Sequence, residues 1–217
     1  ESWPHNGPAG ELLPLVMQRR DNGSSGAGTT QVLEQPVDLT KLSPKYEKFA
    51  TSFIERNKDH PFFLYLPFSH VHTTRPNQPN EQYCGCPYKN ATKRGAFGDA
   101  LAETDALVGA VTKALVANGI AGNTLVLFTG DNGPWMIKAN SAGSTGLFAG
   151  RYSGYWNVGK GSTWEGGIRE AGFAYWPGVI PPASRSAEVV SSLDVFPTVL
   201  KLAGAPLPTD RTIDGKD

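Results

Sequence analysis

The fold is decided by one heptapeptide, Phe128-Thr129-Gly130-Asp131-Asn132-Gly133-Pro134. The run that leads into it, residues 123–129, is rich in apolar, β-branched and aromatic residues, which is typical of a buried strand. Because glycine and proline break this run, the acid and the amide lie at the carboxyl end of the strand, where open α/β sheets bind ligands. Asp131 and Asn132 offer hard oxygen atoms of the kind that Ca²⁺ or Mg²⁺ takes. The alternative is a plain turn, since Asp, Asn and Gly dominate turns.

A second buried strand is predicted at residues 61–67, whose near-continuous apolar run suits a strand that is covered on both faces. The loop that follows carries His70 and His72. In extended backbone, two residues that flank a third point to the same side, and two imidazoles there suit a metal or an oxyanion. The alternative is that backbone carbonyls satisfy one or both rings.

The remaining elements predict an α/β domain. Residues 97–118 carry apolar side chains at steps of three and four, which indicates an amphipathic helix. A strand, a long helix and a strand in this order predict a βαβ crossover with a parallel sheet. Residues 1–40 are expected to be irregular. Further elements are expected as a helix at 42–57, a strand at 171–177 and a short helix that begins near Asp194 and stops at Gly204.

A long stretch rich in Gly, Ser and Tyr, residues 138–161, is predicted to be a functional or disordered loop. At its end, Lys160 lies between two glycines. Glycines let backbone approach a ligand closely, and the ammonium group is a point charge that suits an anion. The alternative for Lys160 is a solvated surface position. Glu165 and Arg169 are spaced for a structural ion pair.

Composition excludes several classes of function. The chain has 217 residues, which is enough for one sizeable domain, and 20 acidic residues balance 20 basic ones. This balance argues against a nucleic-acid or anionic-membrane surface, and no apolar run is long enough to span a membrane. The first residues do not resemble a signal peptide, and the chain begins without Met, which predicts a mature product or a fragment.

Two short motifs have no clear assignment from sequence. Cys84-Gly-Cys86 would form a strained mutual disulfide and lacks the partners of a zinc set, so its role is left open. Asn22-Gly-Ser and Asn90-Ala-Thr match the N-glycosylation acceptor, which favours a secretory route.

Four motifs in one order resemble the sulfatase family, and most closely the lysosomal arylsulfatases of the A and G types. The resemblance covers roughly residues 34–215. The motifs are Pro-Phe-Phe-Leu-Tyr followed by His-x-His (61–72), Phe-Thr-Gly-Asp-Asn-Gly-Pro (128–134), Gly-Lys-Gly-Ser-Thr-Trp-Glu-Gly-Gly-Ile-Arg-Glu (159–170), and Tyr-Trp-Pro-Gly (175–178) with Ser-Ser-Leu-Asp-Val-Phe-Pro-Thr (191–198).

This resemblance implies an alkaline-phosphatase-like α/β/α sandwich with a mostly parallel central sheet, of which residues 41–217 are the central and C-terminal part. Members of the family hydrolyse sulfate esters with a formylglycine hydrate, made from Cys or Ser, beside one bound Ca²⁺. Asp131 and Asn132 match the family's second pair of calcium ligands. His72 matches a sulfate-binding histidine and Lys160 the lysine that holds the sulfate, so both are expected to be catalytic and substrate-binding. His70 is a weaker match and receives no role.

The departures from the family pattern concern the nucleophile. The family's Cys/Ser-x-Pro-x-Arg motif does not occur in these 217 residues. The paired N-terminal aspartates of the calcium shell, and a lysine and a histidine of the site, are also missing. We therefore expect these 217 residues alone to be inactive.

The resemblance implies sulfated small molecules, glycolipids or glycosaminoglycans as substrates, and a lysosomal or secreted location. No nucleic-acid partner and no membrane span are expected, and a homo-oligomer is left open. The loops at 77–95 and 138–158 are expected to flank the site. Two alternatives are a phosphatase or phosphodiesterase of the same superfamily, and a non-catalytic sulfatase-like carbohydrate-binding protein. Two-metal phosphatases use several histidines, and only 4 occur in this sequence.

Overall fold

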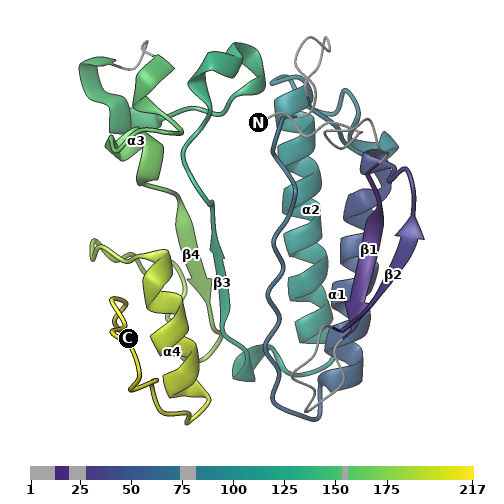
Figure 1. Ribbon diagram of the computed structural model, residues 1–217, viewed down its shortest axis with the longest axis vertical. Helices are drawn as coiled ribbons and strands as arrows, with labels where there is room; N and C mark the ends of the chain where they lie inside the picture. The colour runs from purple at the N-terminus through teal and green to yellow at the C-terminus, as the bar shows by residue number, and fades with distance from the viewer. Residues whose placement is uncertain (1–12, 20–27, 74–81, 153–155) are drawn as a thin grey trace. The chain divides into compact units, whose positions relative to one another are not determined.

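The computed structural model describes residues 13–19, 28–73, 82–152 and 156–217, and the chain forms two compact units, Glu1–Val179 and Ile180–Asp217 (Figure 1). The second unit contains α4 (Val195–Leu202). Within the described residues, none of the helices combines the length and the apolar character that crossing a bilayer requires. The helices and strands of the first unit are β1 (Leu15–Arg19), β2 (Thr29–Glu34), α1 (Leu42–Asn57), α2 (Ala96–Ala117), β3 (Val126–Thr129), α3 (Glu165–Ile168) and β4 (Gly172–Tyr175).

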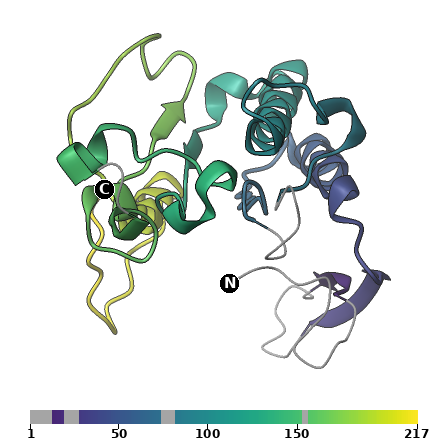
Figure 2. The ribbon, with the colours of Figure 1, turned by 90° about the horizontal axis from the view of Figure 1, so that it is seen from above.

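The two long helices, α1 and α2, lie side by side, as the views in Figures 1 and 2 both show. Each was expected from its apolar periodicity, and both expectations are confirmed to within a residue. The buried residues include Ala50 and Ile54 of α1 and Ala100, Leu107 and Leu115 of α2. Small residues within these buried faces let two helices approach closely while the larger aliphatic side chains interlock.

Residues 1–40, expected to be irregular, contain an antiparallel strand pair, so that expectation is wrong for β1 and β2. The pair forms because both segments carry β-branched or long apolar side chains that pack on one face. Leu15 packs against a small cluster that includes Leu39 and Leu42 at the start of α1. An ion pair between Glu34 of β2 and Lys45 of α1 also joins the hairpin to the helix.

The predicted strand at residues 61–67 is extended but forms no ladder within the described residues. Phe62 instead packs on α1, where its ring lies 5.7 Å from that of Phe53, and just beyond the segment the ring of Phe68 lies 6.5 Å from that of Tyr46. Phe63 and Tyr65 are exposed. The expected parallel pairing of this segment with residues 124–129 is therefore not found.

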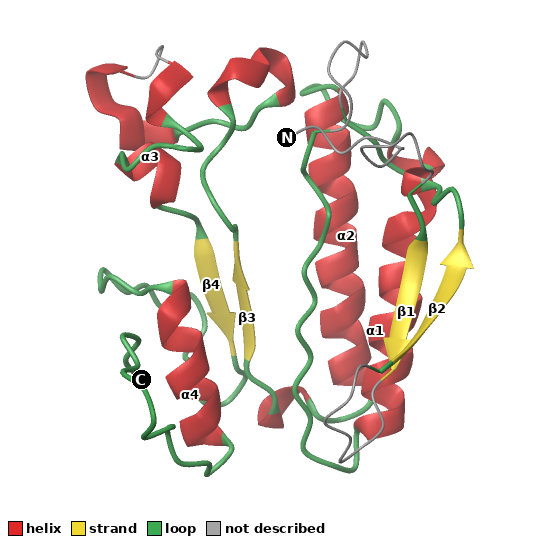
Figure 3. Ribbon diagram, in the orientation of Figure 1, coloured by secondary structure: helices red, strands yellow, loops and turns green. Residues whose placement is uncertain are grey.

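In its place, β3 pairs with β4 in antiparallel register, from Val126 opposite Tyr175 to Thr129 opposite Gly172. Stacked rings of Phe128 and Phe173, 4.9 Å apart, add a cross-strand contact to this ladder. Figure 3 shows the two strands in yellow, each leading at one end into the region of α3. The strand expected to carry Asp131 is thus confirmed, with a different partner.

The stretch expected to be a long loop, residues 138–161, consists largely of short 3₁₀ helices, drawn in red near α3 in Figure 3. Turns of this kind satisfy backbone groups locally where no sheet or long helix is available. They are η4 (Met136–Ser141), η5 (Gly146–Tyr152) and η6 (Trp156–Val158).

The second unit is organised around α4, which confirms the short helix expected from Asp194 to Gly204. Its entry is a capping box, in which Ser191 accepts from backbone N–H groups and the Asp194 carboxylate accepts from the N–H of Ser191. Gly204 ends the helix with a φ of 67°, a left-handed conformation that glycine adopts without strain.

Candidate functional site

Strand β3 delivers Asp131 and Asn132 at its carboxyl end, as the sequence predicted. Asp131 is exposed and Asn132 is half-buried. The Nδ2 group of Asn132 donates to the backbone oxygen of Gly133 at 3.1 Å. Because this bond uses the nitrogen of the amide, the side-chain oxygen is the atom that Asn132 can offer to a ligand.

The turn after β3 is held by direct backbone contact with residues 159–167, which we call the glycine contact. The N–H of Gly133 donates to the carbonyl of Gly167 at 2.9 Å, and the N–H of Lys160 donates to the carbonyl of Pro134 at 2.9 Å. A Cβ on Gly133 would overlap the carbonyl of Gly166, and a Cβ on Gly159 would overlap that of Pro134. The glycine contact therefore brings the backbone of Lys160 beside the turn that carries Asp131 and Asn132.

This contact changes the interpretation of the glycines that flank Lys160. The sequence suggested that they let backbone approach a ligand, whereas Gly159 approaches the protein's own chain at Pro134. Lys160 itself is half-buried, and its Nζ lies 5.8 Å from the centre of the Trp135 ring. Lys138 places its Nζ 4.9 Å from the same ring. Two cations near one aromatic face make this a locally positive region.

Glu170 is a further polar residue of this region, which the sequence did not indicate as a site residue. Its carboxylate fills the space that a side chain at Gly130 would need. Burial raises the pKa of Glu170, and the negative charge of Asp131 raises it further. A nearby cation would lower the cost of ionising Glu170 in this environment.

The donors present fit a hard cation, but only in part. Ca²⁺ takes six to eight oxygen ligands. Over the ranges that the structure describes, no group of three or more His, Cys, Asp or Glu side chains is arranged to hold a metal ion. Asp131 and Asn132 carry two oxygens of a suitable kind, and a calcium site at this turn stays a prediction.

His72 lies in a short turn, residues 69–73, which we call the histidine turn. The backbone N–H of His72 donates to the carbonyl of Ser69 at 3.0 Å, and its Nδ1 lies 2.7 Å from the carbonyl of Thr73. A carbonyl oxygen only accepts, so Nδ1 carries the hydrogen, and Nε2 is the nitrogen at which the neutral ring gains a proton. The expected alternative, a ring held by a backbone carbonyl, therefore applies to Nδ1.

A glutamine joins the histidine turn to the chain that follows Asp131. The side-chain amide of Gln82 donates to the carbonyl of Val71 at 2.9 Å and to that of Ser141 at 3.2 Å. Ser141 is the last residue of η4, which begins two residues after Pro134. The structure thus brings Asp131, Asn132 and Lys160 together through backbone contact and connects His72 to them through Gln82. Convergence of all four side chains on one ligand stays a prediction.

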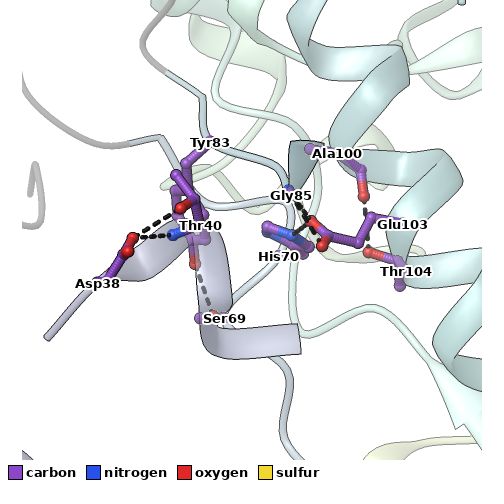
Figure 4. Close-up of polar contacts among 9 residues, drawn as sticks. All are labelled: Asp38, Thr40, Ser69, His70, Tyr83, Gly85, Ala100, Glu103 and Thr104. Carbon is purple, nitrogen blue, oxygen red and sulfur yellow. Dashed lines mark hydrogen bonds and ion pairs between the residues drawn. The ribbon is translucent and has the colours of Figure 1, made fainter. Parts of the chain in front are cut away.

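His70, which received no role from sequence, is buried against an acid of α2 (Figure 4). Its Nε2 lies 2.6 Å from Oε2 of Glu103, and the two side chains are only 3% and 4% exposed. Glu103 also accepts the backbone N–H of Gly85, at 3.1 Å from each carboxylate oxygen.

Sequence reasoning missed Glu103 and its neighbour Asp99, although their spacing contains a signal. Acids at positions i and i+4 lie on one face of a helix, and here that face also carries the buried Ala100 and Leu107. Asp99 accepts the backbone N–H groups of Asn90 and Thr92, each at 2.8 Å. Burial raises the pKa of Asp99, but the N–H donors outweigh burial and leave the pKa below its usual value.

The two cysteines left open by the sequence are free thiols on either side of Gly85. Burial raises the pKa of the Cys84 thiol, and the nearby charge of Glu103 raises it further. A raised pKa disfavours the thiolate, which is the reactive form. Cys84 is therefore unsuited to act as a nucleophile.

Residues 27–205 match the family model described as Sulfatase. Three curated relatives show the same likeness. Steryl-sulfatase from Rattus norvegicus is 44% identical over 186 residues, a match that covers 86% of this chain and 30% of the relative. Arylsulfatase G from Mus musculus is 40% identical over 194 residues, which cover 86% of this chain and 35% of the relative. Arylsulfatase A from Homo sapiens is 40% identical over 185 residues, which cover 84% of this chain and 33% of the relative.

A solved sulfatase, PsFucS1 from Pseudoalteromonas sp., shares the fold with a TM-score of 0.74 and 30% sequence identity. The match covers 88% of this chain and 37% of that one. The expected alkaline-phosphatase-like α/β fold is thereby confirmed for the part of the domain seen here. The chain spans about a third of the length of the relatives that it matches.

Proposed function

The chain belongs to the sulfatase family, and from this premise we propose that it contributes the anion-binding part of a site that hydrolyses sulfate esters. The glycine contact is the observation that carries the proposal. It holds Lys160 beside the turn with Asp131 and Asn132, so that a cationic group and two hard oxygens lie in one region. An ester of sulfuric acid needs both kinds of group, because it carries a negative charge and gains more on its leaving oxygen during cleavage.

His72 and Lys160 are the residues that we assign to the substrate. Lys160 neutralises sulfate oxygens as a point charge. His72 holds its Nδ1 hydrogen on the carbonyl of Thr73, so the protonated ring presents its second hydrogen at Nε2. From there it can donate to a sulfate oxygen or to the leaving oxygen, as a general acid does.

Asp131 and Asn132 would hold one Ca²⁺ through their side-chain oxygens. When bound, such an ion stabilises anionic oxygens and favours an ionised nucleophile. The adjacent Glu170, whose pKa burial and Asp131 raise, supports a requirement for positive charge here.

The nucleophile lies outside the residues that we assign. Since the sequence contains no Cys/Ser-x-Pro-x-Arg motif, a formylglycine would have to come from a segment other than these 217 residues. We accordingly propose that the 217-residue chain alone does not hydrolyse 4-nitrocatechol sulfate. The coding sequence around this segment distinguishes two hypotheses, a sulfatase and a binding protein. A complete transcript without the motif would support a non-catalytic carbohydrate-binding role.

The proposed substrates are sulfated small molecules, glycolipids or glycosaminoglycans, and the proposed location is lysosomal or secreted. Asn90, one of two glycosylation acceptors, is exposed in a turn with a φ of 59°, which is accessible to a modifying enzyme. Asn22 lies outside the described residues. A homo-oligomeric state stays a prediction.

Titration of the ¹⁵N-labelled chain with sodium sulfate tests the anion site. We expect saturable shifts in the amide signals of residues 159–167, with affinity reduced about tenfold or more in Lys160→Ala, since a hydrogen bond to a charged group is lost. Lys48→Ala is the matched control, because it removes the same charge from an exposed position on α1. Equal weakening in both variants, or equal shifts with sodium chloride at the same ionic strength, would contradict a specific site.

A further inference from the structure

We propose that Glu103 is a positioning residue, which acts through His70 to fix the turn that carries His72. The inference rests on the proposed function, in which His72 contacts the sulfate group. Glu103 lies on α2, 33 positions from His70 in sequence, and the structure brings the two side chains into contact (Figure 4).

The Glu103 carboxylate contacts two donor groups in a buried environment. It accepts the N–H of Gly85 at 3.1 Å and lies 2.6 Å from Nε2 of His70. Both side chains are almost wholly withdrawn from water, at 3% and 4% exposure. A charged acceptor in such surroundings binds its donors more tightly than at the surface, and losing it leaves those donors unsatisfied.

His70 depends on this contact for its orientation. Its other ring nitrogen, Nδ1, is buried and has no hydrogen-bond partner within the described residues. The ring also packs against Tyr83, with centroids 4.6 Å apart. A tilted ring contact restrains position more than rotation, so the bond from Nε2 to Glu103 sets which way the imidazole faces.

The histidine turn is restrained at Ser69 as well as at the adjacent His70, and Ser69 contacts His72 directly. The hydroxyl of Tyr83 donates to Oγ of Ser69 at 2.6 Å, and the carbonyl of Ser69 accepts the N–H of His72 at 3.0 Å. Ser69 is thus held by the Tyr83 side chain, and the adjacent His70 by Glu103 of α2. The backbone of His72 is fixed in turn by Ser69. Supporting contacts of this kind decide how accurately a binding side chain is placed.

Asp99 provides a matched control on the same helix. It is also buried, at 3% exposure, and accepts two backbone N–H groups, where Glu103 accepts that of Gly85. Unlike Glu103, which contacts a histidine, Asp99 accepts from Asn90 and Thr92. Glu103→Gln and Asp99→Asn therefore remove the same charge, at the same depth, from positions one turn apart.

The test uses the side-chain ¹H–¹⁵N spectrum of the labelled full chain, in which 4 histidines give separable signals. In the unsubstituted protein, His72 should show the Nδ1–H tautomer and a sulfate-dependent shift. Glu103→Gln should move the His72 signals and weaken sulfate binding about tenfold, the low end for outer partners of ligating histidines. Asp99→Asn should leave the His72 signals in place, even if it lowers the melting temperature as much as Glu103→Gln does.

Two results would overturn the proposal. One is a Glu103→Gln protein that melts earlier with unchanged His72 signals, since Glu103 would then serve stability alone. The other is an equal displacement of His72 in both variants, since the effect would then be general loosening. If sulfate fails to shift His72 in the unsubstituted chain, the proposed function fails, while the tautomer comparison still tests the positioning role.

A second variant covers the case in which Glu103→Gln does not fold. Tyr83→Phe keeps the ring that packs on His70 and removes only the hydroxyl that donates to Ser69. It should displace the His72 signals in the same direction by a smaller amount. Unchanged His72 signals in folded Tyr83→Phe would show that the contact between Tyr83 and Ser69 does not position His72, and would overturn the proposal.

Discussion

The glycine contact and the histidine turn carry the candidate residues, yet they are held in opposite ways. The glycine contact joins backbone to backbone, with Gly133 N–H on Gly167 carbonyl and no side chain between them. The histidine turn is held by side chains from elsewhere, namely Glu103, Tyr83 and Gln82. The first depends on the absence of Cβ atoms, and the second on the charge and protonation of particular groups. The two regions should therefore fail under different perturbations.

The largest effect on stability is expected from Gly133→Ala, which disrupts the glycine contact. The new Cβ would overlap the backbone carbonyl of Gly166, and a backbone atom cannot move aside as a flexible side chain does. We expect the free energy of unfolding to fall by about 3 kcal/mol or more. Chemical denaturation measures this change, and the sulfate-dependent shifts of residues 159–167 should disappear with it.

Gly109→Ala is the control for this substitution. Gly109 lies inside α2, and a Cβ there would meet nothing within 4 Å. Alanine should stabilise the helix by about 0.5–1 kcal/mol, because glycine loses more conformational freedom on folding. A Gly133→Ala protein as stable as the unsubstituted one would show that the backbone contact does not hold this region.

Alkaline pH should weaken the histidine turn through Tyr83. Burial raises the pKa of Tyr83 from 10.0 to about 12, and its hydrogen bond to Ser69 lowers the pKa only in part. The unfolded chain loses the phenolic proton at lower pH than the folded protein. Below pH 10, burial of the neutral Tyr83 thus contributes about 2–3 kcal/mol to the free energy of unfolding. This contribution is lost as pH rises to 12.

The measurement is the stability of the chain and of Tyr83→Phe from pH 9 to pH 12. The other tyrosines titrate in both proteins, so the difference between the two curves isolates Tyr83. Parallel curves would contradict the burial of this hydroxyl. The amide signals of the glycine contact should stay in place longest, because no titratable side chain takes part in its backbone hydrogen bonds.

A smaller effect is expected from Ca²⁺ at the turn beside the glycine contact. Asp131 and Asn132 supply two oxygens where the ion takes six to eight, so affinity should be millimolar or weaker. We expect 10 mM Ca²⁺ to stabilise the chain by about 1 kcal/mol or less. Thermal unfolding with and without the ion measures it, and Asp131→Asn should abolish the gain. Micromolar affinity in calorimetry would show that further ligands complete the shell.

Local pattern predicted most of the secondary structure correctly. The periodicity of residues 42–57 and 97–118 was sufficient for α1 and α2, because helix hydrogen bonds join residues four apart. Pairing of strands was not predictable in this way, since β3 and β4 meet across more than 40 residues of chain. The aromatic run at 61–67 was interpreted as a sheet strand, whereas within the described residues it joins no ladder and Phe62 packs on α1.

The candidate-site residues also fall into those that local sequence could predict and those that it could not. Asp131, Asn132 and Lys160 could be found from sequence because each stands within a short motif whose residue types have a chemical reason. Glu103 could not be connected to His70, because the contact spans 33 positions and a helix acid is exposed in most proteins. The glycines beside Lys160 were singled out from sequence, but only the structure shows that Gly159 approaches Pro134.

The smallest effect is expected from the ion pair on α3, next to the glycine contact. Nη1 of Arg169 lies 2.8 Å from Oε2 of Glu165, as the spacing predicted, but both side chains are 58% exposed. The guanidinium also lies 4.9 Å from the centre of the Phe148 ring. Water screens the pair, so Arg169→Ala should cost about 0.5 kcal/mol or less. A double-mutant cycle with Glu165→Ala measures the pair itself.

This last variant sharpens the comparison because it removes a side-chain contact and leaves the backbone contact intact. The hydrogen bond from Gly133 to Gly167 lies only two residues away from Arg169 and should persist. Sulfate-dependent shifts in residues 159–167 should therefore match those of the unsubstituted chain. If Arg169→Ala weakened sulfate binding as much as Gly133→Ala, side chains would have to share in holding this region, and its contrast with the histidine turn would disappear.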